Sequence, residues 1–249
     1  MFVMEYGEKN AETVVLVHGG GLSWWNFREA AEKLQHEYHV VLPVLDGHAE
    51  SGCEFSSIAD AAEKLIAYID QRFRGHVALI GGVSLGAQVL TEMLARRPDI
   101  CRCALIESAL ALPMPLTRAL VGPMLDVSYG LICRRWFARM QAASLGIGAE
   151  LFEEYYRDSC SISKESMKAM LKANASYSAR PELAQAGARV LICAGGREIP
   201  VMRRSARLLH RMIPGSEVRI IKGMKHGEFS LNHAEAYAQT VRKLLSEQD

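Results

Sequence analysis

Short apolar runs alternate with amphipathic segments along most of the chain. The runs are four or five residues long and almost entirely apolar, as at residues 13–17 and 77–80. Strands that are buried on both faces of a parallel sheet have this character, whereas strands with one solvated face alternate polar and apolar positions. We therefore expect buried strands at residues 13–17, 39–42, 77–80, 102–106, 190–193 and 218–221.

Helical spacing separates most of these strands. In residues 58–73, for example, Ile58, Leu65 and Ile69 fall on one face and charged residues on the other. Strands that alternate with helices form right-handed βαβ units, which predicts an α/β fold with a mostly parallel, doubly wound sheet. Ligands of such sheets bind beyond the carboxyl ends of the strands. The expected helices cover residues 27–35, 58–73, 85–96, 202–212 and 234–246.

The alternation stops between residues 112 and 188. This stretch opens with Pro113 and Pro115, is rich in methionine and aromatic residues, and has no strand pattern. We predict a core formed by residues 1–111 and 189–249, with residues 112–188 inserted as a helical cap over the strand ends. Most apolar side chains of the cap would pack it onto the core, and a few would line a pocket.

Composition and charge narrow the class of protein. The chain has 249 residues with 29 basic and 28 acidic side chains, which argues against a nucleic-acid binder because such proteins usually carry a basic excess. The first residues lack a signal-peptide pattern, and residues 77–90 are too short to span a bilayer, which takes about 20 residues. We expect a soluble, cytoplasmic protein without a membrane span. The six cysteines lack the spacing of a metal site.

The strongest chemical signal is the glycine-flanked serine in residues 82–86 (GVSLG), directly after an expected strand and at the start of an expected helix. A serine on such a sharp turn has strained backbone angles, so its neighbours must be small, as Gly82 and Gly86 are. The turn exposes the Ser84 hydroxyl and leaves the Leu85 amide at a helix N-terminus, where it can donate to an oxyanion. Ser84 is therefore the expected nucleophile.

A second glycine cluster, residues 18–21 (HGGG), follows the strand at 13–17. Consecutive glycines let the backbone approach a ligand closely, so the Gly20 amide is the expected second oxyanion donor, with Gly21 as the alternative. A nucleotide-binding loop is disfavoured because Ser23 and Trp24 stand where G-x-G-x-x-G needs its last glycine.

With these motifs in place, the chain resembles the α/β-hydrolase family over essentially its whole length. Residues 18–25 look like the family's oxyanion loop, and residues 82–87 resemble its nucleophile elbow. Residues 46–51 (DGHAES) resemble its D-x-G-H-G-x-S turn, with one residue missing and Ala49 in place of a glycine. Residues 223–227 (GMKHG) resemble the loop that carries the catalytic histidine.

The expected base is His226. It follows the last expected strand between two glycines, which puts it at the same edge of the sheet as Ser84, and a serine nucleophile needs a base within hydrogen-bond reach. His18 and His48 lie near that edge too, but their glycine-rich contexts favour turn-forming roles.

The acid that orients the histidine is less clearly marked. The family places it in the loop before the histidine strand, usually as Asp, and the matching residue here is Glu198. The order Ser84, Glu198, His226 agrees with that of the fold. The alternative is Glu107, at the end of the strand at 102–106, with Glu198 then a solvated loop charge.

The resemblance implies a serine hydrolase that forms an acyl-enzyme on Ser84 and needs neither cofactor nor metal. We expect a carboxylesterase acting on small or medium apolar ester-like molecules. A thioesterase or a carbon–carbon bond hydrolase would use the same residues, and a ligand receptor that retains the triad is the alternative from another class. Fold resemblance does not fix the substrate, and the sequence leaves the oligomeric state open.

Overall fold

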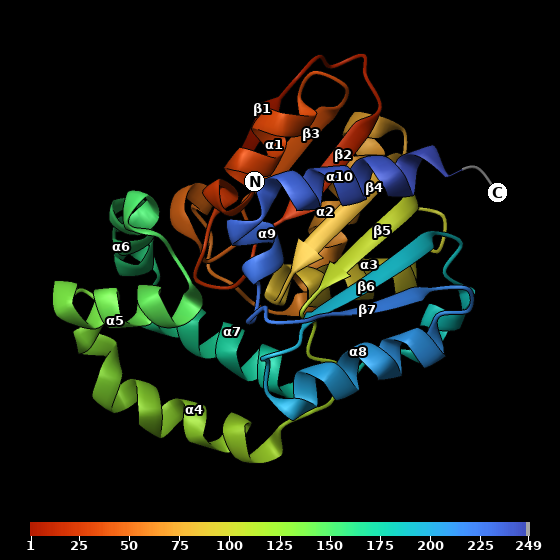
Figure 1. The fold of residues 1–249 in the computed structure, drawn as a ribbon. Helices are drawn as coiled ribbons and strands as arrows, with labels where there is room; N and C mark the ends of the chain where they lie inside the picture. Colours follow the sequence, from red (N-terminus) through yellow and green to blue (C-terminus); the bar gives the residue numbers. More distant parts are fainter. Residues whose placement is uncertain (248–249) are drawn as a thin grey trace.

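The computed structural model describes residues 1–247, which form a seven-stranded sheet covered by helices on both faces (Figure 1). The strand order is β1-β3-β2-β4-β5-β6-β7, and all neighbours are parallel except β1 and β3. The predicted α/β class with a mostly parallel, doubly wound sheet is confirmed. The strands are β1 (Val3–Tyr6), β2 (Thr13–Val17), β3 (His39–Pro43), β4 (Val77–Val83), β5 (Cys101–Glu107), β6 (Arg189–Gly195) and β7 (Glu217–Ile221).

Helices make up most of the remaining described residues. The α-helices are α1 (Arg28–Leu34), α2 (Ile58–Phe73), α3 (Leu85–Arg96), α4 (Pro115–Ser128), α5 (Arg135–Leu145), α6 (Phe152–Ser161), α7 (Lys164–Ser176), α8 (Pro200–Met212), α9 (Glu228–Asn232) and α10 (Ala234–Ser246). Short 3-10 turns are η1 (Trp24–Phe27), η2 (Ala49–Ser51), η3 (Tyr129–Leu131), η4 (Ala149–Leu151) and η5 (Pro181–Gln185).

Each strand and helix expected from the sequence is present, and α2, α3 and α10 have the predicted bounds. Outside residues 112–188, one strand and one α-helix were not predicted. The edge strand β1 has only four half-buried residues, so it lacks the apolar run that marks the central strands. Helix α9 has five residues, fewer than the two turns that a helical pattern needs to become visible.

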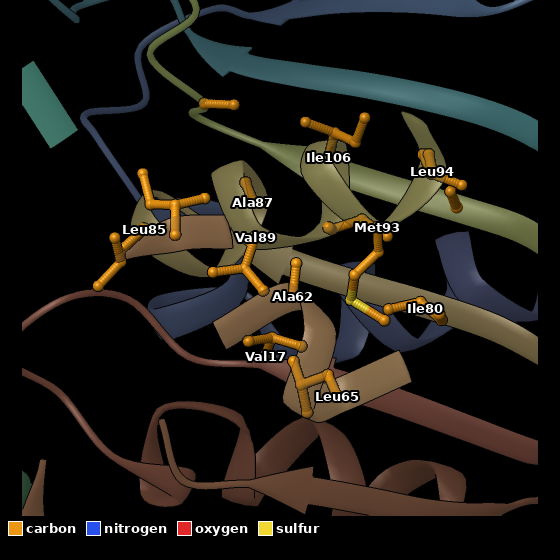
Figure 2. Packing of buried hydrophobic residues seen from close by; sticks show 14 of the residues in the cluster. Val17, Ala62, Leu65, Ile80, Leu85, Ala87, Val89, Met93, Leu94 and Ile106 are labelled. Carbon is orange, nitrogen blue, oxygen red and sulfur yellow. The ribbon is translucent and has the colours of Figure 1, made fainter. Parts of the chain in front are cut away.

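Alternating side chains of the strands build a core on each face of the sheet. Val14 and Leu16 of β2 pack on the face covered by α1 and α10, whereas Val15 and Val17 pack on the face covered by α2, α3 and α8. Figure 2 shows the second face, where Ala62 of α2 lies beside Val89 of α3. The two covered faces explain why the central strands are almost entirely apolar.

Residues 112–188 contain helices α4 to α7 and three of the 3-10 turns; no strand lies between β5 and β6 in the part of the chain that the structure describes. We call this segment the helical insertion. It lies to one side of the sheet, beyond the carboxyl ends of the central strands (Figure 1). Its treatment as a separate cap domain stays a prediction. Within residues 1–247, no helix has both the length and the apolar character that crossing a membrane requires.

The close approach of α3 to β2 generates the first prediction. A Cβ atom on Gly86 would overlap the carbonyl oxygens of Val17 and His18, which are backbone atoms and cannot move aside separately. We expect Gly86→Ala to lower the free energy of unfolding by about 3 kcal/mol, as overpacked cores do. Urea denaturation measures this, with Gly130→Ala as the control because no atom lies within 4 Å of its added methyl. Equal midpoints for the two variants would contradict the prediction.

Candidate active site

Four polar side chains lie just beyond the carboxyl ends of four adjacent strands. Ser84 follows β4, Ser108 follows β5, Glu198 follows β6 after a short loop, and His226 follows β7. Because neighbouring parallel strands end at the same edge, residues far apart in the sequence meet there. The sheet thereby brings Ser84, Glu198 and His226 together, as the sequence predicted for their positions.

The turn at Ser84 is strained in the way its flanking glycines indicate. Ser84 has φ 53° and ψ −112°, a left-handed conformation that is rare for a residue with a side chain. The turn is so tight that a Cβ on Gly82 would lie 2.5 Å from the carbonyl oxygen of Gly86. Leu85 is the first residue of α3, so its amide has no acceptor within the helix.

A continuous chain of hydrogen bonds joins the three side chains. The Ser84 Oγ lies 2.9 Å from His226 Nε2, and His226 Nδ1 lies 2.8 Å from Glu198 Oε2. An ionised carboxylate only accepts hydrogen bonds, so the His226 proton is on Nδ1 and Nε2 accepts from the serine hydroxyl. The Glu198 side chain is fully buried, whereas 40% of the His226 side chain is exposed. The histidine can therefore reach a bound molecule while its orienting partner stays fixed.

The second oxygen of Glu198 is held separately. Glu198 Oε1 accepts hydrogen bonds from the Ser108 hydroxyl at 2.8 Å and from the Gly195 amide at 2.6 Å. Burial alone would raise the pKa of Glu198, but the hydrogen bond and charge of His226, together with these two donors, lower the pKa below its usual value. The carboxylate is thus ionised and fixed in one orientation.

Ser108 was not identified from the sequence. It has φ 54°, and its hydroxyl also accepts a hydrogen bond from the Gly227 amide at 3.3 Å, so it links the loops of Glu198 and His226. The only sequence signal was its place directly after a strand beside that of Ser84.

Glu107 lies close by but faces elsewhere. Its carboxylate accepts hydrogen bonds from the amides of Phe229 at 3.1 Å and Ser230 at 3.2 Å, at the first turn of α9. Burial raises the pKa of Glu107 to about 7, and the hydrogen bonds from Ser230 and the charge of His226 offset only part of that rise. The structure therefore distinguishes the two candidate acids. Glu198 is hydrogen-bonded to His226, whereas Glu107 is hydrogen-bonded to backbone amides of the segment that follows His226.

His18 and His48 act on the backbone of the neighbouring loops. His18 Nε2 accepts from the Leu45 amide, and His48 Nε2 accepts from the Gly21 amide, each at 3.0 Å. Burial lowers the pKa of His18 to about 3 and that of His48 to about 4, so both rings are neutral near pH 7.

Since the Gly21 amide already has an acceptor, Gly20 is the better placed of the two glycines for an oxyanion. A Cβ on Gly20 would lie 3.4 Å from Cδ2 and 3.5 Å from Cβ of Leu85, so Gly20 lies against the first residue of α3.

A cavity of about 530 Å³ opens from Ser84 into the helical insertion. Its walls carry no Asp, Glu, Lys or Arg, and its polar groups are few, such as Gln141, Ser159 and Asn174. A volume of this size suits a small organic molecule, and uncharged walls favour an uncharged one because a buried, unpaired charge is costly. Among residues 1–247, no group of three or more His, Cys, Asp or Glu side chains is arranged to hold a metal ion.

Comparison with known proteins agrees with this geometry. A pimeloyl-[acyl-carrier protein] methyl ester esterase of Neisseria meningitidis serogroup B is 27% identical over 246 residues, which cover 93% of this chain and 92% of that protein. A thermophilic esterase from Thermogutta terrifontis superposes with a TM-score of 0.78 at 19% identity, over 98% of this chain and 94% of the other. An enol-lactonase from Burkholderia xenovorans LB400 gives 0.79 at 16% identity, over 99% and 96%.

At such identities the two solved structures establish a shared fold, and the methyl ester esterase supports ester hydrolysis in general terms. The model of the alpha/beta hydrolase family matches residues 14–240, which is most of the polypeptide and includes all three hydrogen-bonded residues, Ser84, Glu198 and His226. The protein belongs to the alpha/beta hydrolase family.

Proposed function

We propose that the protein hydrolyses carboxylic esters of small or medium, uncharged, apolar molecules through an acyl-enzyme on Ser84. The observation that carries this proposal is the series of hydrogen bonds from Ser84 through His226 to Glu198. Ser84 also lines a cavity without charged side chains. A serine hydroxyl is a weak nucleophile by itself, and an adjacent oriented base is the arrangement that activates it.

In the first step, the Ser84 oxygen attacks the ester carbonyl while His226 Nε2 takes the hydroxyl proton. The carbonyl oxygen becomes an oxyanion, to which the amides of Leu85 and Gly20 donate. His226 then passes its proton to the leaving alcohol as the carbon–oxygen bond breaks, which leaves the acyl group on Ser84. The ionised Glu198 stabilises the imidazolium that exists between the two transfers.

In the second step, water attacks the acyl-enzyme by the same path. His226 takes a proton from the water, the oxyanion forms again, and the Ser84 oxygen leaves with that proton as the carboxylic acid is released. The exposed side of the His226 ring supports this step, because water must approach Nε2.

We assign the acid role to Glu198 and a supporting role to Glu107. Glu198 lies within hydrogen-bond distance of His226, and its lowered pKa keeps it ionised. Glu107 holds the first turn of α9, directly after the histidine loop, through the amides of Phe229 and Ser230. The raised pKa of Glu107 would leave it partly protonated near pH 7, which suits a structural group better than a charge partner.

The helical insertion acts in this proposal as a cap that sets the substrate range. The name of the Neisseria relative, a pimeloyl-[acyl-carrier protein] methyl ester esterase, supports a methyl or other small ester at the end of an apolar chain as the first compound class to test. Thioester and carbon–carbon bond hydrolysis use the same residues, and comparing the turnover of an ester, a thioester and a carbon–carbon substrate separates the three activities. A triad-retaining receptor would bind such molecules without turnover.

Removal of the Ser84 hydroxyl tests the nucleophile. We expect Ser84→Ala to lower kcat for p-nitrophenyl butyrate by about 10³-fold or more, because the acyl-enzyme can no longer form. Ser246→Ala, at the exposed end of α10, is the matched control and should keep wild-type turnover. Saturable ligand binding by a wild-type protein that cleaves no acyl ester would instead support the receptor.

A pair of isosteric variants tests the acid. We expect Glu198→Gln to lower kcat by about 10²-fold or more, because an amide cannot stabilise the imidazolium, and Glu107→Gln to retain most of kcat. Steady-state kinetics with the same ester measures both. The opposite ranking would transfer the acid role to Glu107.

The raised pKa of Glu107 also predicts a pH dependence of stability. Between its ordinary value of 4.5 and about 7, the native carboxyl keeps a proton that the unfolded chain has released, so the native state loses stability as pH rises through this window. Glu107→Gln removes this titration. We therefore expect the wild type to lose up to about 3 kcal/mol relative to the variant between pH 4.5 and 7. Urea denaturation across this range should give diverging curves, and parallel curves would contradict the burial effect.

A further inference from the structure

The exposed apolar side chains of the protein gather on the helical insertion. Eight of the eleven large apolar side chains that are exposed in the described part of the chain belong to this segment. Single exposed apolar residues are common on protein surfaces, but a concentration of them marks a contact surface. The eight are Leu116, Leu120, Met124, Val127, Trp136, Met140, Leu145 and Leu171.

Four of these side chains form one stripe along α4, which we call the α4 stripe: Leu116, Leu120, Met124 and Val127. Their spacing of three or four residues places them on one face of the helix. They are 74%, 54%, 52% and 82% exposed, respectively, so the whole length of the face is open. The opposite face of α4 is buried and packs against α7. Figure 1 shows α4 at the outer edge of the molecule, away from the sheet.

The α4 stripe is continuous with the cavity at Ser84. Met124, Leu145 and Leu171 are exposed and also line the cavity, so they form its apolar rim. An apolar chain that enters past these side chains meets apolar surface from the outside of the molecule to the candidate nucleophile. A protein partner seated on the same rim would cover this entrance, whereas a lipid surface would supply the apolar molecules that enter it.

Most charged side chains of α4 and α5 are basic. Residues 115–145 contain four arginines and one aspartate, Asp126, and that aspartate pairs with Lys164 of α7. Arg118 and Arg134 are exposed, and no acidic side chain among residues 1–247 forms an ion pair with either. Arg118 lies two residues from Leu116 and from Leu120, so it belongs to the polar side of α4 and not to the stripe. Amphipathic segments that lie on anionic bilayers carry basic residues on their polar side and apolar residues on the other.

We propose that the protein docks on an anionic phospholipid surface through the α4 stripe, with Arg118 and Arg134 contacting the headgroups and the cavity rim facing the lipid. The apolar side chains would enter the boundary between headgroups and acyl chains, and the arginines would remain at headgroup level. This surface goes beyond the proposed esterase activity and does not depend on it, because binding needs no chemistry at Ser84.

Vesicle flotation tests the docking directly. We expect the wild type to float with vesicles of 30% phosphatidylglycerol in phosphatidylcholine, less with pure phosphatidylcholine, and less at high salt. The double variant Leu120→Glu/Val127→Glu should lower the partition coefficient at least about tenfold. Its two glutamates replace apolar side chains whose transfer from water into the lipid favours binding. Arg118→Gln/Arg134→Gln should lower only the preference for the anionic vesicles.

Two controls separate docking from folding and from catalysis. Ala236→Glu adds a charge at an exposed position of α10 and should float like the wild type, and thermal unfolding checks that every variant is folded. Ser84→Ala should also float like the wild type, so loss of esterase activity and loss of docking remain distinguishable.

Three results would overturn the proposal. The first is that the wild type floats with neither kind of vesicle. An acidic protein would then be the better candidate for the partner that covers the α4 stripe. The second is that Leu120→Glu/Val127→Glu floats as the wild type does. The third is a wild-type dimer, measured by light scattering, that the same double variant dissociates, since a second copy of the chain would then cover the stripe.

Discussion

The constraint on which the site depends is the strained turn between β4 and α3. Ser84 is held at positive φ, and this conformation persists only because Gly82 and Gly86 let three backbone segments meet where no side chain fits. The same close approach brings α3 against the end of β2, and the Leu85 side chain lies against Gly20. One local geometry thereby sets the position of Ser84, the packing of α3 and the contact between Leu85 and Gly20.

Environment, rather than residue type, distinguishes the ionisable groups around this turn. Glu198 and Glu107 are both buried glutamates at adjacent strand ends, yet the donors around Glu198 lower its pKa, whereas burial raises that of Glu107. Likewise, buried His18 and His48 are neutral and hold backbone amides, whereas His226 keeps one side open to solvent. The division of roles follows from which hydrogen-bond partners the loops supply.

Apolar runs were sufficient to predict six of the seven strands, and glycine-flanked motifs were sufficient to place Ser84 and His226 at one edge of the sheet. The edge strand β1 was missed because its pairing with β3 depends on tertiary contact more than on its own pattern. The choice between Glu198 and Glu107 needed side-chain directions, which strand order alone does not provide. Ser108 belongs to no motif, and only its backbone angle and two contacts distinguish it from other serines.

The residues that line the cavity come from two separate parts of the sequence. Fourteen of its eighteen lining residues come from the helical insertion, and the other four, Gly20, Gly21, Ser84 and Leu85, belong to the strand-end loops. The hydrogen bonds at Gly21 and Ser84 are made with His48 and His226, which lie outside the insertion, so substitutions in the insertion can reshape the walls while these bonds remain. Selection for a new substrate can therefore act on one contiguous stretch of the gene, and exchange of that stretch between relatives would transfer substrate preference without rebuilding the chemistry.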